Sequence, residues 1–109
     1  MTITIRNLTD ADQNAWESLW QGYLTFYKTE LPENVINHTW SRLMISGQDP
    51  NGLCAVTKDG NTVGIVHYLF HRTTWAVGDY CYLQDLFVAA EARGTGTGRA
   101  LIEAVYAAA

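Results

Sequence analysis

The sequence has little of what marks a secreted or membrane-spanning protein. Only 2 of its 109 residues are cysteine, and Cys54 and Cys81 stand too far apart to form a short-spaced metal-binding or redox motif. We therefore expect two reduced, partly buried thiols in a cytoplasmic protein. No apolar run approaches the roughly 20 residues that cross a bilayer, and residues 1–6 lack the basic and then apolar layout of a secretory signal.

Charge is also scarce, with 17% charged residues and a formal net charge of −4. A general nucleic-acid-binding protein needs a basic surface, so nucleic acid is not expected as a partner. No group of histidine, cysteine and aspartate residues has the spacing of metal ligands, so no metal site is expected either. The hydrophobic content of 48% is nevertheless that of a folded globular chain.

The residues that are present predict one domain over residues 1–109, of the α/β (α+β) class, with the element order β-α-α-β-β-β-α. Alternating apolar residues predict the strands, and apolar residues three or four apart predict the helices. An Asp-Gly pair at Asp59 predicts a tight hairpin between the second and third strands. Strands are expected over residues 3–8, 53–57, 62–71 and 80–88, and helices from Thr9 or Asp10, from Pro32 toward Gly47, and over residues 98–109.

Each predicted helix carries one apolar stripe that we expect to face the core. The three stripes consist of Trp16, Leu19, Trp20, Tyr23, Leu24 and Tyr27, of Val35, Ile36, Trp40, Leu43 and Met44, and of Leu101, Ile102, Val105 and Tyr106.

The last helix runs into three alanines at Ala109 without a capping glycine or proline, so we expect the chain to be incomplete at its C-terminus.

The most informative segment is a glycine-rich stretch between the last strand and the last helix. Its three alternating glycines permit positive φ and let backbone N–H groups approach a phosphate. The helix that follows adds free N–H groups and the positive end of its dipole. The alternative is a flexible turn that is merely rich in glycine. The candidate phosphate ligands are Arg93, Gly94, Thr95, Gly96, Thr97, Gly98 and Arg99.

Two well-known phosphate loops do not match this stretch. A nucleotide P-loop ends in Gly-Lys-Ser/Thr, whereas Gly98 is followed by Arg99. The dinucleotide fingerprint needs a third glycine where Arg99 stands.

Residues 93–98 instead match the Arg/Gln-x-x-Gly-x-Gly/Ala signature of GNAT-superfamily N-acetyltransferases. The strand before the stretch and the amphipathic helix after it stand in the order of that family's acetyl-CoA site, and the predicted elements match the family's first seven over the whole chain. The chain thus resembles the spermidine/spermine, thialysine and yeast HPA-type branch of the family. The resemblance implies a mixed, mostly antiparallel sheet flanked by helices, with the last strands absent, and acetyl-CoA as co-substrate.

The resemblance also implies roles for residues of the cofactor site. The backbone of Leu86, Phe87 and Val88 would pair with the pantetheine arm, and one N–H of this stretch would support the thioester oxygen. The loop N–H groups, with Arg93 and Arg99, would hold the pyrophosphate. Without the family's fifth strand the 80–88 strand would expose an unpaired edge. We therefore expect either a longer functional protein or a second copy that completes the sheet, as in a homodimer.

Acetyl transfer needs a neutral amine, whereas an alkyl ammonium has a pKa of about 10.4, so the site must accept a proton. The polyamine enzymes carry Glu-Asp where this chain has Gln84 and Asp85. Gln84 can orient an ammonium or a water but cannot take a proton, which leaves Asp85 as the best acceptor. Alternatively, Asp85 only anchors a neighbouring loop or the substrate charge. A regular strand points the two residues to opposite faces, so both reach one site only if the strand is bulged, as in the family.

Three aromatic residues are further candidates for the acceptor site. Trp75 stands where the polyamine enzymes have a tryptophan beside the amine channel and can bind a cation over its ring, or else it folds onto the core. Tyr23 and Tyr27 belong to the first helix, which walls the acceptor site in the family, although their spacing equally makes them core. We expect His67 to be buried and hydrogen-bonded rather than a base, and His71 is a minor candidate for a proton relay.

These observations predict an N-acetyltransferase that moves an acetyl group from acetyl-CoA directly to a primary amine of a small molecule. A polyamine-like or amino-acid-like acceptor is preferred. Two alternatives stay open: an acceptor amine on a protein or peptide, and a non-catalytic acetyl-CoA-binding module. Release of free thiol in the presence of an amine distinguishes the enzyme from the binding module.

Overall fold

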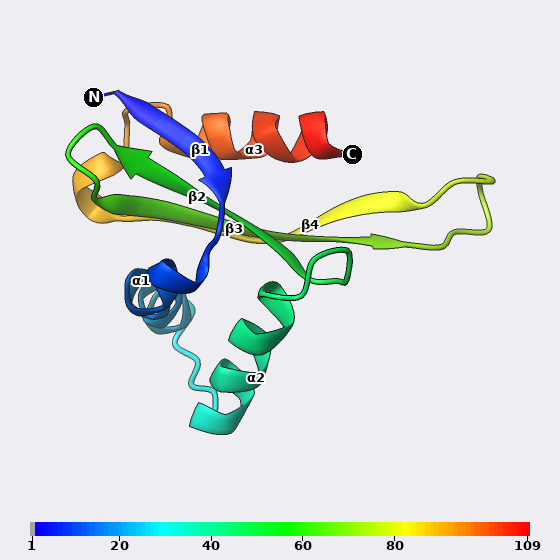
Figure 1. The fold of residues 1–109 in the computed structure, drawn as a ribbon, viewed down its shortest axis with the longest axis horizontal. Helices are drawn as coiled ribbons and strands as arrows, with labels where there is room; N and C mark the ends of the chain where they lie inside the picture. The colour runs from blue at the N-terminus through cyan, green and yellow to red at the C-terminus, as the bar shows by residue number, and fades with distance from the viewer. Residues whose placement is uncertain (1) are drawn as a thin grey trace.

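The computed structural model describes residues 2–109 and has a four-stranded sheet with helices on both faces (Figure 1). The predicted order of elements is confirmed, with two short 3-10 turns added to it. None of the helices in residues 2–109 has the length and apolar character that crossing a membrane requires. The elements are β1 Ile3–Asn7, η1 Asp10–Asp12, α1 Gln13–Phe26, α2 Glu33–Leu43, β2 Asn51–Thr57, β3 Thr62–His71, β4 Tyr80–Val88, η2 Ala90–Ala92 and α3 Thr97–Ala108.

The sheet has the strand order β1-β2-β3-β4, and every neighbouring pair is antiparallel. Helices α1 and α2 cover one face and α3 covers the other, while the far end of the β3–β4 hairpin extends beyond both helical layers (Figure 1). Within residues 2–109, β4 pairs with β3 alone. One edge of β4 is therefore free of strand partners in the described part of the chain.

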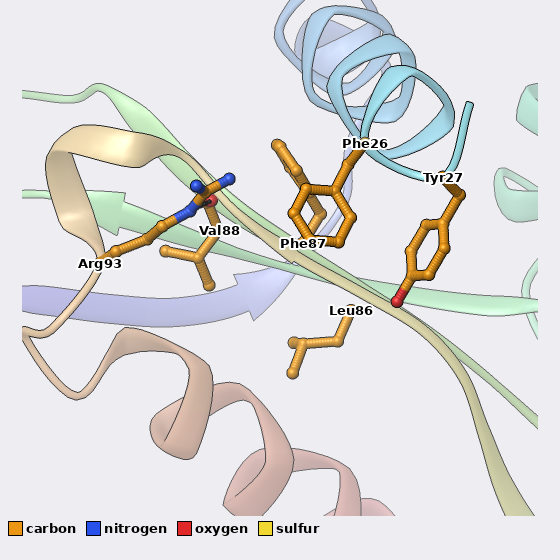
Figure 2. A pocket seen from close by; sticks show the side chains of 6 residues that line it. All are labelled: Phe26, Tyr27, Leu86, Phe87, Val88 and Arg93. Atoms are coloured by element: carbon orange, nitrogen blue, oxygen red, sulfur yellow. Dashed lines mark hydrogen bonds between the residues drawn. The ribbon is translucent and has the colours of Figure 1, made fainter. Parts of the chain in front are cut away.

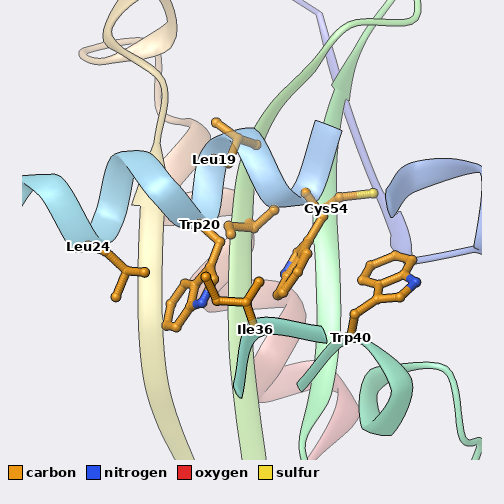
Figure 3. Close-up of a cluster of buried hydrophobic side chains, with 8 residues drawn as sticks. Leu19, Trp20, Leu24, Ile36, Trp40 and Cys54 are labelled. Carbon is orange, nitrogen blue, oxygen red and sulfur yellow. The ribbon is translucent and has the colours of Figure 1, made fainter. Parts of the chain in front are cut away.

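Each face of the sheet has its own apolar core, because successive side chains of a strand point to opposite faces. Indole rings dominate the core on the α1 and α2 side (Figure 3). Smaller aliphatic side chains fill the core on the α3 side. The first core consists of Trp16, Leu19, Trp20, Leu24, Ile36, Trp40, Cys54 and Ile65, and the second of Leu53, Ala55, Val63, Val66, Tyr68, Ala92, Leu101 and Val105.

Three residues of the predicted apolar stripes are exposed, and their assignment to the core was wrong. The exposed fractions are 60% for Tyr27, 40% for Val35 and 72% for Tyr106. Tyr27 is the C-cap of α1 and lies past the turns that cover the sheet. On α3 the buried residues are Thr97, Leu101 and Val105, each one turn after the last, and Tyr106 lies outside this stripe.

Several element boundaries differ from the predicted ones, and the largest shifts are the start of α1 at Gln13 and the end of α2 at Leu43. Pro32 is the N-cap of α2 rather than part of its first turn, and its carbonyl accepts the N–H groups of Val35 and Ile36. Strand β2 begins at Asn51, and α3 begins at Thr97. Such shifts are expected, because the first turn of a helix is set by capping bonds more than by apolar spacing.

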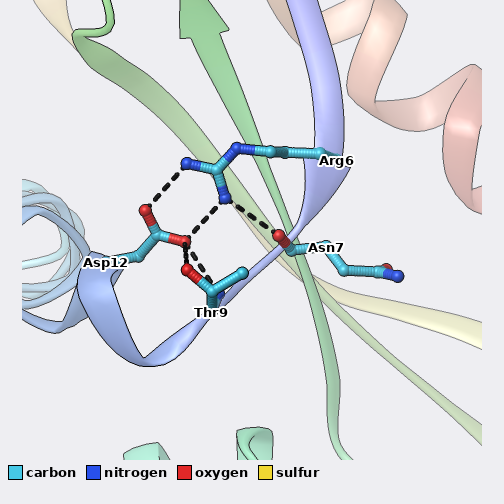
Figure 4. Close-up of polar contacts among 4 residues, drawn as sticks. All are labelled: Arg6, Asn7, Thr9 and Asp12. Atoms are coloured by element: carbon cyan, nitrogen blue, oxygen red, sulfur yellow. Dashed lines mark hydrogen bonds and ion pairs between the residues drawn. The ribbon is translucent and has the colours of Figure 1, made fainter.

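The start of α1 is fixed by an ion pair that spacing alone did not predict (Figure 4). Asp12 accepts two hydrogen bonds from Arg6, at 2.7 and 2.9 Å, and its Oδ2 also accepts the backbone N–H of Thr9 at 2.7 Å. The Asp12 side chain is 7% exposed. This bidentate pair ties β1 to the turn that leads into α1.

Replacing Asp12 with asparagine should lower the free energy of unfolding at pH 7 by about 1–2 kcal/mol. The hydrogen bond from Arg6 is the main cause that lowers the pKa of Asp12 from 3.8 to about 2, against an opposing effect of burial. Because the folded pKa is the lower one, this stabilisation is complete above the unfolded value and is lost as the pH falls from 3.8 toward 2. Urea unfolding of both proteins across this range measures the difference, with the exposed Asp10→Asn as control. A difference that stays constant down to pH 2 would contradict the assignment.

Candidate active site

A β-bulge in β4 determines where the predicted acceptor residues point. Asp85 is opposite His67 on β3, and Leu83 is opposite the next residue, Tyr68, so Gln84 is an extra residue without a partner on β3. Gln84 and Asp85 were expected to share one site only if the strand is bulged, and this bulge is present. An extra residue in one strand shifts the side-chain alternation by one position.

The burial of neighbouring residues follows from this shift. Leu83 and Leu86 are three positions apart, yet both pack in the core on the α3 side. Beyond the bulge, Phe87 packs in the core on the α1 side. Asp85 lies on the same face as Phe87, where its carboxylate meets His67. The bulge thus turns a carboxylate toward α1 that a regular strand would have turned toward α3.

Asp85 is held by a chain of buried hydrogen bonds. The indole Nε1–H of Trp16 donates to His67 Nε2 at 2.9 Å, and His67 Nδ1 lies 3.0 Å from Asp85 Oδ2. Because an indole can only donate, His67 Nε2 must accept, so the neutral imidazole carries its proton on Nδ1 and donates it to Asp85. His67 is 2% exposed, which confirms the expectation of a buried, hydrogen-bonded histidine.

Tyr23 of α1 is the second group beside the Asp85 carboxylate. Burial, followed by a hydrogen bond to Asp85, raises the pKa of Tyr23 to about 12. The phenol therefore stays protonated at neutral pH and does not act as a base. Tyr23 also stacks on Trp20, with ring centroids 4.9 Å apart. The structure thus gives Tyr23 both predicted places, beside the acceptor residues and partly in the core.

A cavity of about 430 Å³ opens beside the bulge, between β3, β4 and α2. We call it the acceptor cavity. It brings together Gln84 and Asp85, as predicted, and adds Arg42 and Asp49, which sequence reasoning missed. The cavity is lined by Trp20, Thr39, Arg42, Asp49, Pro50, His67, Leu69, Gln84 and Asp85.

A second cavity, of about 290 Å³, follows directly along β4 (Figure 2). We call it the edge cavity. It contains Leu86, Phe87 and Val88, the predicted pantetheine strand, together with Arg93 and with Phe26 and Tyr27 from the end of α1. The Phe26 ring, which is 64% exposed, was not singled out from the sequence. Tyr27 lines this cavity and not the acceptor cavity.

The glycine-rich loop has the backbone geometry that a phosphate cradle needs. Gly94 and Gly96 have φ values of 81° and 83°, and a Cβ added at either would meet nothing within 4 Å. The first intrahelical bond of α3 runs from Ala100 N–H to the Gly96 carbonyl, 3.0 Å long. The N–H groups of residues 97–99 precede that bond and are available to an anion. Open space beside free N–H groups fits the pyrophosphate of acetyl-CoA.

The side chains of the loop only partly follow the prediction. The Thr97 side chain is buried, with a residue exposure of 1%, and its hydroxyl lies 2.8 Å from that of Thr95. Thr95 in turn donates to the Ala92 carbonyl. Both hydroxyls are therefore hydrogen-bonded inside the loop, and their part in binding a phosphate stays a prediction. Buried backbone carbonyls need hydrogen-bond donors, and in this loop the Thr95 hydroxyl is the donor to the Ala92 carbonyl.

The two arginines of the loop are both accessible. Arg93 Nε donates to the Val88 carbonyl at 3.0 Å, and its guanidinium lies 5.4 Å from the centroid of the Phe87 ring. Arg93 therefore extends from the loop over the edge cavity (Figure 2). Arg99 pairs with Glu103 one turn along α3, at 3.2 Å, and its side chain is 85% exposed.

Of the residues predicted for the acceptor site, Tyr23, Trp75 and His71 line neither cavity. Trp75 lies in the extended β3–β4 connection and is 86% exposed, so the expectation that it folds onto the core was wrong. It lines neither the acceptor cavity nor the edge cavity. His71, at the end of β3, is also remote from both and contacts the Arg72 carbonyl. Across residues 2–109, no group of three or more histidine, cysteine, aspartate or glutamate residues could hold a metal ion.

Comparison with known proteins gives one family. A profile of the Acetyltransferase (GNAT) family matches residues 12–109. The chain is 38% identical to the D-amino-acid N-acetyltransferase HPA3 of Saccharomyces cerevisiae, over 95% of this chain and 65% of the relative. The chain thus spans slightly less than two thirds of the length of this curated relative.

Solved structures agree on the fold. A possible acetyltransferase from Clostridium difficile 630 superposes with a TM-score of 0.82 at 17% identity, over 99% of this chain and 71% of that chain. AAC(6')-Iy, in complex with the bisubstrate analog CoA-S-monomethyl-acetylneamine, gives a TM-score of 0.82 at 16% identity, over 98% of this chain and 71% of that chain. At such identities the likeness concerns the fold alone.

Proposed function

The chain belongs to the GNAT family of acetyltransferases, and from that premise we propose that it transfers the acetyl group of acetyl-CoA to the primary amine of a small, amino-acid-like acceptor. The family match supports the class of reaction. The yeast relative, a D-amino-acid N-acetyltransferase, supports an amino acid rather than a polyamine as the acceptor.

The observation that carries this proposal is that consecutive residues of β4 line the two cavities. Residues 84–85 line the acceptor cavity and residues 86–88 line the edge cavity. An amine beside Asp85 in the first cavity and an acyl group beside Phe87 in the second would then lie on neighbouring residues of one strand. Holding two reactants in line in this way replaces a bimolecular encounter by a step within one complex.

Residues of the loop and of β4 would bind the co-substrate. The N–H groups of residues 97–99 would hold its pyrophosphate, with Arg93 and Arg99 as further cationic donors. The backbone of Leu86–Val88 would pair with the pantetheine arm along the free edge of β4. When bound, acetyl-CoA supplies an activated thioester carbonyl, so the chain has only to hold, orient and deprotonate the acceptor.

Asp85 is the proton acceptor in this proposal. Its carboxylate receives a hydrogen bond from His67, and this donor keeps it oriented at the wall of the acceptor cavity. A carboxylate has about four lone-pair sites, so it can still receive the proton of an ammonium, directly or through a water. Gln84, which also lines the cavity, would orient the amine through its amide oxygen.

Release of free thiol from acetyl-CoA tests the proposal. The assay uses freshly purified protein with a panel of D- and L-amino acids, polyamines and lysine peptides. Amine-dependent release, greatest with amino acids, is the expected result. Burial raises the pKa of Cys54 to about 11 and also raises that of Cys81, so the protein's own thiols should add little background. Tight acetyl-CoA binding without release for any amine would favour a non-catalytic binding module.

A further inference from the structure

Charges of both signs line the acceptor cavity. Asp49 and Asp85 contribute carboxylates, and Arg42, in the last turn of α2, contributes a guanidinium. No ion pair of Arg42 occurs within residues 2–109. Asp49 is instead satisfied by neutral donors, since its Oδ1 accepts the Asn51 side-chain amide at 2.9 Å and the Phe70 backbone N–H at 3.1 Å. The guanidinium is therefore free to bind an anionic group of a ligand.

We propose that Arg42 binds the carboxylate of the acceptor, so that the site selects amino acids over amines that lack a carboxylate. This inference rests on the proposed acetyltransferase function. In an amino acid, the ammonium would face Asp85 of β4 and the carboxylate would face Arg42 of α2. A guanidinium binds a carboxylate through two parallel hydrogen bonds. This contact would strengthen binding of the amino acid and would also orient its amine toward Asp85.

The same charge distribution disfavours the other acceptors. A polyamine brings only cations, so Arg42 would repel one of them. A peptide segment would need more room, because small-molecule sites start at about 300 Å³ and this cavity of about 430 Å³ is near that lower limit. Leu69, Pro50 and Trp20 supply an apolar wall for the amino-acid side chain.

The test compares matched acceptors with and without a carboxylate in the wild type and in Arg42→Ala. Suitable pairs are alanine with ethylamine and phenylalanine with phenethylamine, with both enantiomers of each amino acid. In Arg42→Ala, kcat/KM for the amino acids should fall by about ten- to a hundredfold, mostly through KM. For the amines without carboxylate it should rise severalfold, because the cavity loses a positive charge. Arg42→Lys keeps the positive charge but cannot donate two parallel hydrogen bonds, so it should show an intermediate loss of kcat/KM for the amino acids.

Lys58→Ala provides the matched control, because Lys58 is an exposed cation in the β2–β3 turn that does not line the acceptor cavity. An equal loss for both members of each pair would overturn the inference and would assign Arg42 to stabilising the C-terminus of α2. Calorimetric binding of the amino acid to the full chain gives a second readout. Loss of this binding in Arg42→Ala supports the carboxylate site even if no amine is acetylated, an outcome that would reject the proposed function alone.

Discussion

Replacing Gly96 with valine should raise the KM for acetyl-CoA by about a hundredfold and leave the fold in place. Gly96 is the N-cap of α3 and has a φ of 83°. A β-branched residue avoids this conformation, and its side chain would occupy the open space beside the free N–H groups of residues 97–99. The loss of two charge-assisted hydrogen bonds to a phosphate accounts for a change of this size.

The β2–β3 turn offers a matched control for backbone strain. Gly60 has a φ of 90° and also has nothing within 4 Å of an added Cβ. Gly60→Val and Gly96→Val should therefore lose similar amounts of stability, about 1–2 kcal/mol in thermal unfolding. Only Gly96→Val should weaken acetyl-CoA binding. If both variants bind acetyl-CoA equally well, the loop is a simple turn and the cradle lies elsewhere.

Replacing Asp85 with asparagine should lower kcat at pH 7 by about a hundredfold, the effect of removing a general base. The deficit should shrink as the pH rises toward the amine pKa of about 10, because the acceptor is then already neutral and no longer needs a proton acceptor. The measurement is a pH profile of kcat for one amino acid from pH 6 to pH 10. The KM for acetyl-CoA should stay close to that of the wild type, since Asp85 does not line the edge cavity.

Asp79→Asn is the control for this experiment. Asp79 is an exposed carboxylate in the turn before β4, so its removal changes the net charge by the same amount without touching the acceptor cavity. A loss of kcat in Asp85→Asn that is the same at every pH would give Asp85 a positioning role. An unchanged kcat would place the proton acceptor on another group.

Much of the candidate cofactor site could be predicted from the sequence, because its geometry depends on residues that are neighbours in the chain. Glycine permits the positive φ that Gly94 and Gly96 adopt, and the free N–H groups follow from the start of a helix directly after them. The hairpin at Asp59-Gly60 is local in the same sense. The residue types do not predict that the hydroxyls of Thr95 and Thr97 bond to each other and within the loop.

The acceptor site was less predictable, because it depends on contacts between elements far apart in the chain. The donor to Asp85 is His67 of β3, which Trp16 of α1 holds in turn, and no sequence pattern predicts the pairing of Trp16 with His67. Arg42 lies in the last turn of α2, far from Gln84 in the sequence, and only the tertiary structure places both side chains at one cavity. Trp75 does not fold onto the core, because the β3–β4 connection that carries it extends beyond both helical layers (Figure 1).

The sequence by itself determined the order of the elements, the two-faced character of the sheet and the glycine-rich loop in front of α3. These properties depend on the conformations that single residues allow and on apolar spacing within one element. The tertiary structure alone decided that β4 is bulged at Gln84, that Asp85 meets His67 and Tyr23, and that Arg42 shares their cavity. Register and packing between strands and helices are set by the whole set of side chains that meet in the two cores, so no single segment specifies them.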